Sequence, residues 1–341
     1  MTGAQSSVLL IADPGAPVAI AKRLSDSLPS ALATVGGEWK VSVRRDAFPV
    51  DEHAEVMEVV HTVDPASEAE DIVIYLTDLP RRRETTPLVA DISLDDHFGI
   101  ISVPGVGGVA IDRRIRNLAR TVVAEVTRQP ETRSRSIKQL TRIQDDDVVH
   151  YLAPTALSRL RLLTGMVYAN RPWRLATGLS KVIMAAFATG AVSLAYPTMW
   201  QLSDTMGPWR LSVATVLATT AMVTWLILHH ELWERPQSAS ERERAALYNA
   251  ATAVTLTIGV AIFHMGLFVL LLLTAWWTLP PQLVAQSIGH PFGFSSLLTL
   301  AWLVAAVATL GGALGSGMED DDAVKAAAYG VRQRKRFDKS K

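Results

Sequence analysis

The sequence predicts an α/β N-terminal domain with a mixed sheet, followed by an all-α membrane domain of about four transmembrane helices. Two observations carry this prediction. Charged residues make up 19% of the 341-residue chain, but residues 182–317 contain only a handful of them. Short apolar runs alternate with amphipathic stretches before residue 128, whereas long apolar stretches follow residue 176.

The N-terminal pattern predicts the element order β-α-β-α-β-β-β-α over residues 1–128. We expect strands at residues 7–13, 39–43, 71–77, 88–93 and 99–103, and helices at 16–35, 52–61 and 111–127. Pro29 can kink the first helix or end it early. The last two strands are close in sequence, which favours a hairpin over a helical crossover. Because Gln129 opens a polar stretch, residues 129–175 are interpreted as a linker with an amphipathic elbow helix at 153–170 that can lie in the membrane interface.

Ligands of open α/β sheets usually bind at the carboxyl ends of strands, so the residues that follow two buried strands are candidates. This ligand-binding set comprises Asp13, Gly15, Thr77, Asp78, Arg81, Arg82 and Arg83. An arginine cluster at this edge can bind a phosphate or a carboxylate. The alternative is a solvated positive loop close to anionic lipid headgroups.

A glycine-rich segment, VPGVGG at residues 103–108, lies between a predicted strand and a predicted helix. The backbone around Gly105, Gly107 and Gly108 can form a nest for an anion, or it can simply make a tight turn. No nucleotide fingerprint accompanies it, because the first strand is followed by ADPGAP rather than by a glycine-rich phosphate loop.

Four apolar stretches, at residues 179–200, 211–228, 250–277 and 296–314, predict the transmembrane domain at 176–317. Lysine and arginine concentrate in the connection after the second stretch and in the tail at 318–341, whereas the other connections have only Arg210. The positive-inside rule therefore predicts a multi-pass protein of the cell inner membrane with both termini cytoplasmic. The absence of a signal peptide in MTGAQSS agrees with this orientation.

Polar residues within or beside the spans are the next candidates. His264 lies in mid-span and can hydrogen-bond to a neighbouring helix, or it can belong to a transport path. His230 and Glu234 have i,i+4 spacing and are weak candidates for metal ligands. Gly311 and Gly315 are spaced for close helix contact within a chain or in a homo-oligomer. The chain has no cysteine, which excludes disulfides and thiolate chemistry.

Several N-terminal segments together resemble a family of actinobacterial membrane proteins with an N-terminal α/β domain, some of which carry the name methylenetetrahydrofolate dehydrogenase. The segments are VLLIADPGAPVAIAKRLSDSLP, IVIYLTDLPRR, PLVADIS, IISVPGVGG and RRIRNLAR. The Tyr-x-x-x-Lys pattern of folate dehydrogenases has no counterpart in a matching place, so the resemblance implies no catalytic residue. A fainter similarity, in strand order alone, is to archaemetzincin proteases. Their zinc-binding histidines are absent from the helix at residues 118–127.

These patterns favour a non-enzymatic scaffold or sensor whose cytoplasmic domain binds a protein partner or a small anionic ligand, with the lipid bilayer around its spans. We expect no cofactor and no nucleic-acid partner, although the formal net charge of zero argues neither way on the latter. One alternative is a membrane-anchored enzyme with its site near Asp13, Asp78 and Arg81–Arg83. Another is a transporter or channel subunit that depends on His264.

Overall fold

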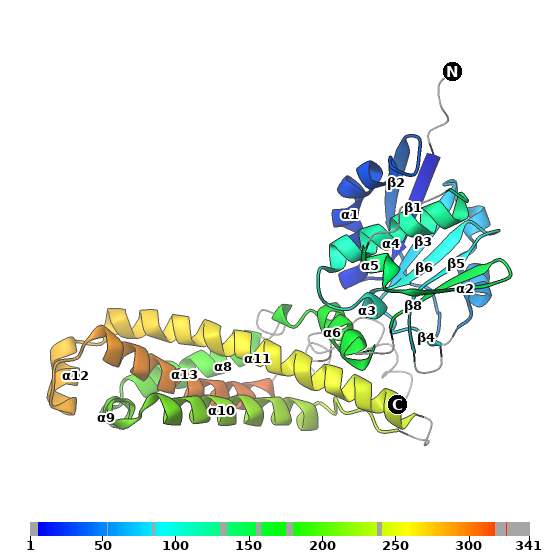
Figure 1. Ribbon diagram of the computed structural model, residues 1–341. Helices are drawn as coiled ribbons and strands as arrows, with labels where there is room; N and C mark the ends of the chain where they lie inside the picture. The colour runs from blue at the N-terminus through cyan, green and yellow to red at the C-terminus, as the bar shows by residue number, and fades with distance from the viewer. Residues whose placement is uncertain are drawn as a thin grey trace. The chain divides into compact units, whose positions relative to one another are not determined.

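The computed structural model describes residues 6–52, 54–83, 86–129, 135–154, 158–174, 180–236, 241–317 and residue 325. The chain divides into two compact units, and the boundary falls between Asn170 and Arg171. The first unit is an α/β domain with a mixed sheet and the second is helical (Figure 1). The predicted fold class is confirmed.

The sheet of the α/β domain has the strand order β2-β1-β3-β6-β5-β8-β7. The parallel half consists of β2 (Trp39–Arg45), β1 (Ser6–Ala12), β3 (Ile72–Thr77) and β6 (Phe98–Ser102). The antiparallel half consists of β5 (Thr86–Ser93), β8 (Val148–Leu152) and β7 (Thr141–Asp145), while β4 (Arg82–Arg83) pairs with β5. The antiparallel pairing of β5 with β6 confirms the predicted hairpin.

Helices cover both faces of this sheet, and alternate strand residues point to the two faces. On one face α1 (Ala16–Leu32) and α4 (Ile111–Val126) pack on a core that includes Leu10 and Ile74. On the other face α2 (Val56–Val63) packs on Ile11 and Tyr75. Pro29 lies inside α1 and does not end it.

The α/β domain extends beyond the predicted boundary at residue 128. The polar stretch expected to be a linker contains the short helix α5 (Arg135–Lys138) and then the hairpin β7–β8, which joins the sheet through β5. Its first strand is polar because it is an edge strand that pairs only with β8. The predicted elbow corresponds to α6 (Ser158–Asn170), which lies in the first unit and packs on α3 (Val103–Val106).

The helical unit contains helices of membrane-spanning length. They are α10 (Pro208–His229), α11 (Arg242–Thr278) and α13 (Phe294–Ser316). The predicted first span is broken into α8 (Ser180–Leu194) and α9 (Pro197–Thr205), which meet at an angle of 87°. The break lies just before Pro197, since proline cannot donate the backbone hydrogen bond that would continue the helix. The described residues thus contain three such spans, or four if the bent pair counts as one, as a multi-pass membrane protein requires.

Close helix contacts within the bundle involve the predicted pair Gly311 and Gly315 on α13. A Cβ atom at Gly311 would collide with Thr189 of α8, and one at Gly315 would lie 2.5 Å from the Cβ of Ala185. Both glycines therefore serve packing within this chain. Their use between chains stays a prediction.

Candidate anion-binding site

The strand-end residues Asp13, Thr77 and Asp78 come together as the sequence predicts. The Asp13 carboxylate is fully buried and accepts hydrogen bonds from the Tyr75 hydroxyl at 2.6 Å, the Thr77 hydroxyl at 2.7 Å and the Asp78 amide at 3.1 Å. Gly15 has a φ of 114° where α1 begins, which suits glycine. The Asp13 carboxylate thus joins the ends of β1 and β3 and is sequestered from solvent.

The predicted arginine cluster does not converge on one anion. Arg81 is buried, with Nη1 2.6 Å from Asp91 Oδ2 and Nη2 donating to the Ala54 carbonyl. Arg83 extends along the edge of the sheet and pairs with Asp145 at 3.0 Å. Arg82 lies between them on β4. Since Arg81 and Arg83 are already neutralised by carboxylates of the protein, the expected phosphate site at this loop is not formed.

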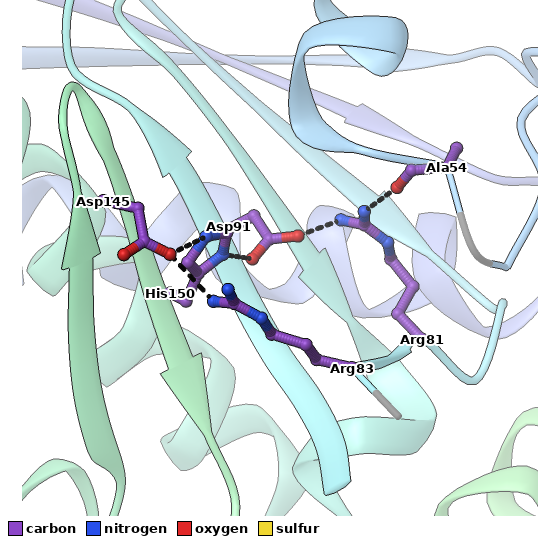
Figure 2. Close-up of polar contacts among 6 residues, drawn as sticks. All are labelled: Ala54, Arg81, Arg83, Asp91, Asp145 and His150. Carbon is purple, nitrogen blue, oxygen red and sulfur yellow. Dashed lines mark hydrogen bonds and ion pairs between the residues drawn. The ribbon is translucent and has the colours of Figure 1, made fainter. Parts of the chain in front are cut away.

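Instead, ionisable side chains form a chain of contacts across β4, β5, β8 and β7 (Figure 2). His150 Nδ1 lies 2.7 Å from Asp91 Oδ1, and its Nε2 lies 3.7 Å from Asp145 Oδ2. The sequence interpretation missed Asp91, Asp145 and His150, although an aspartate inside the apolar run LVADIS was a usable signal. Asp91 lies at the centre of this chain of contacts, because its carboxylate contacts both Arg81 and His150.

The glycine-rich segment packs closely against α6, and its amides do not form an open nest. The Gly105 amide donates to the Ser102 hydroxyl, the Gly107 amide to the Pro104 carbonyl and the Gly108 amide to the Thr164 hydroxyl. Glycine is required because a Cβ at Gly108 would lie 2.6 Å from the Thr164 carbonyl oxygen of α6. These amides therefore donate within the protein, and anion recognition at this segment depends on side chains.

Two arginines meet beside the glycine-rich segment. Arg114 of α4 donates from Nη1 to the Val106 carbonyl at 3.1 Å, and Arg161 of α6 donates from Nε to the Gly105 carbonyl at 2.9 Å. Together they line a hollow of about 20 Å³ with residues of α3, α4 and the segment before β7. The lining consists of Val106, Arg114, Leu118, Ile137, Gln139, Leu140 and Arg161. This convergence was not predicted from the sequence.

The described residues that line the hollow include two guanidinium groups and no carboxylate. Burial, and to a lesser extent the positive charge of the neighbouring Arg114, lower the pKa of Arg161 to about 10. The Arg161 side chain therefore still carries its full charge at neutral pH. In the part of the chain that the structure describes, no carboxylate lies within ion-pair distance of either guanidinium. Each guanidinium has five N–H donors and uses one in these contacts, so donors remain for an oxyanion.

The remaining candidates lie in the helical unit. The expected helical spacing of His230 and Glu234 is not realised, because α10 ends at His229 and the chain after it is not helical. The described residues contain no group of three side chains placed to hold a metal ion. His264 Nδ1 lies 2.9 Å from the Thr309 hydroxyl of α13, which matches the predicted hydrogen bond to a neighbouring helix.

Comparison with models of known protein families, with curated proteins and with solved structures finds no match. The function must therefore be inferred from the arrangement of the residues themselves.

Proposed function

We propose that this chain is an inner-membrane protein whose cytoplasmic α/β domain binds a small anionic ligand between Arg114 and Arg161, as a non-enzymatic sensor or scaffold. The observation that carries the proposal is the partly buried arginine pair without a carboxylate partner among the described residues. Removing charge from water is costly unless an opposite charge compensates for it. A bound anion would supply that compensation.

The composition of the hollow favours binding over catalysis. Its lining contains arginine, aliphatic side chains and the amide of Gln139. None of these lining residues is a serine, threonine, histidine, aspartate or glutamate, the types that usually serve as nucleophile or general base. Guanidinium groups fix the position of an oxyanion but do not exchange protons at neutral pH. The side chains of the hollow are thus suited to bind an anion rather than to convert it chemically.

The helical unit supports the proposed membrane location and orientation. Basic residues Lys181, Arg242 and Arg244 lie where α8 and α11 begin. The exposed Trp209 lies where α10 begins and the exposed Trp277 where α11 ends. Basic residues are enriched on the cytoplasmic side of membrane proteins, and tryptophan is enriched at the interfaces. This distribution fits a cytoplasmic start of α8 and α11.

Isothermal titration calorimetry of the full chain in detergent tests the proposal, with sodium phosphate, sodium sulfate and sodium acetate as probes. We expect at least one oxyanion to bind, and Arg114→Gln and Arg161→Gln each to weaken its affinity about tenfold or more, as the loss of a charge-assisted hydrogen bond does. Arg113→Gln is the matched control, since Arg113 is an exposed neighbour on the same helix. The proposal would be overturned if none of the probes gave a heat of binding, or if the affinity were the same in the wild type and all variants.

A further inference from the structure

We infer that the hollow between Arg114 and Arg161 recognises a dianionic phosphoryl group, the terminal phosphate of a monoester. This inference rests on the proposed function and names the class of ligand. Charge balance is its first support. The site presents two guanidinium charges and, among the residues that the structure describes there, no anion. A carboxylate or a phosphodiester would leave one of the two charges uncompensated, whereas a phosphate monoester dianion neutralises both.

The geometry of the arginines is the second support. Arg114 and Arg161 come from different helices, and each is fixed by one N–H on successive carbonyls, those of Val106 and Gly105. Their remaining donors therefore approach the hollow from two helices rather than as one planar fork. A single carboxylate has two oxygens, which one bidentate guanidinium can occupy. A phosphoryl group has three strong acceptor oxygens, so both guanidinium groups can donate to it at once.

The size of the hollow is the third support. Its volume of about 20 Å³ is close to the room for one water-sized group, so a single phosphoryl oxygen can enter it, whereas a nucleobase or a sugar ring cannot. The buried apolar side chains Leu118 and Ile137 border it. The exposed Gln139 lies at its rim, where its amide can contact whatever the ester oxygen carries. The bulk of the ligand would thus remain outside.

Methyl phosphate and dimethyl phosphate distinguish recognition of a dianion from recognition of a monoanion. Only methyl phosphate, the monoester, becomes a dianion, with a pKa near 6. Calorimetry on the full chain in detergent should give methyl phosphate an affinity at least tenfold higher at pH 8 than at pH 5. Dimethyl phosphate and acetate should bind weakly at both pH values. The described lining contains no aspartate, glutamate, histidine or lysine, and arginine does not deprotonate between pH 5 and pH 8, so the change in affinity belongs to the ligand.

Variants of the two arginines test whether methyl phosphate binds in the hollow. Arg114→Gln and Arg161→Gln should abolish the preference for the dianion, and Arg113→Gln should preserve it. Arg114→Lys and Arg161→Lys keep the charge but lose the planar guanidinium, and they should retain the pH dependence with reduced affinity. These lysine variants keep the test decisive if a glutamine variant fails to fold.

A phosphate monoester can be soluble or can be the headgroup of phosphatidic acid, and nanodiscs distinguish the two. If nanodiscs with phosphatidic acid, but not with phosphatidylglycerol, suppress methyl phosphate binding, the group comes from the lipid; if neither does, it comes from a soluble monoester. Equal binding of acetate, dimethyl phosphate and methyl phosphate at pH 8 would overturn the inference and leave the anion-binding proposal standing. If no probe shows binding that depends on Arg114 and Arg161, both this inference and the proposed function are overturned.

Discussion

Replacing Asp91 by asparagine is expected to destabilise the α/β domain strongly. The Asp91 side chain is 2% exposed and contacts Arg81, whose side chain is 3% exposed, at 2.6 Å. The same carboxylate contacts His150 at 2.7 Å. An asparagine side chain at this position would have nearly the same shape but no charge, so Arg81 would stay buried without an anion. Breaking a buried pair by removing one partner typically costs about 3–5 kcal/mol.

The magnitude can be checked against an exposed pair in the same chain of contacts. Arg83 and Asp145 lie 3.0 Å apart, but their side chains are 48% and 54% exposed. An exposed pair is worth at most about 1 kcal/mol. Asp145→Asn should therefore cost several-fold less than Asp91→Asn.

The assay is urea unfolding of the full chain in detergent, followed by pulsed hydrogen exchange of peptides from β5 and β8. These strands carry Asp91 and His150, so their exchange reports on the unit that the pair stabilises. The double variant Arg81→Met/Asp91→Leu should recover much of the loss, because apolar residues of similar size can replace a buried ion pair. A cost of Asp91→Asn no larger than that of Asp145→Asn would refute the reasoning.

Other predictions follow from packing and charge. Gly311→Ala should lower the thermal stability of the detergent-solubilised chain by about 1–3 kcal/mol through overpacking, whereas Gly266→Ala, with open space around its Cβ, should not. The hydrogen bond that His290 Nε2 donates to the Asp204 carboxylate raises the pKa of His290, so this contact is fully stabilising below the ordinary histidine pKa and is lost as pH rises through the raised value. Asp204→Asn should lower the midpoint of the His290 NMR titration. Gln139→Glu would place a carboxylate at the rim of the hollow and should weaken methyl phosphate binding at least about tenfold, measured by calorimetry.

Much of the fold could be predicted because periodicity is local. Apolar runs such as residues 72–77 and the amphipathic pattern of α4 are visible in the sequence, as are the long apolar spans. The hairpin β7–β8 could not be predicted in this way. Its outer strand is polar, and its partner β5 lies about sixty residues earlier, so only tertiary pairing reveals it.

Of the candidate site, the sequence shows the glycine-rich segment but not the pair of arginines. The glycine-rich segment was identified at the right place, but the direction of its amides depends on α6, which supplies Thr164 from a distant part of the sequence. A helical wheel places Arg114 on the polar face of α4, where arginine is usually solvated. Its meeting with Arg161 follows from the packing of α6 on α3, which the sequence pattern does not contain.

The described lining of the hollow has no carboxylate, and this is informative because the same domain neutralises comparable arginines. On α4 itself, Asp112 pairs with Arg23 at 2.7 Å and Glu125 pairs with Arg142 at 2.8 Å. Carboxylates are thus available on the helix that carries Arg114, yet none of the described ones serves the hollow. A protein selected for stability alone would have little reason to leave two guanidinium groups facing each other there, because their desolvation and repulsion oppose folding. The cost is consistent with a site whose compensating charge arrives with the ligand.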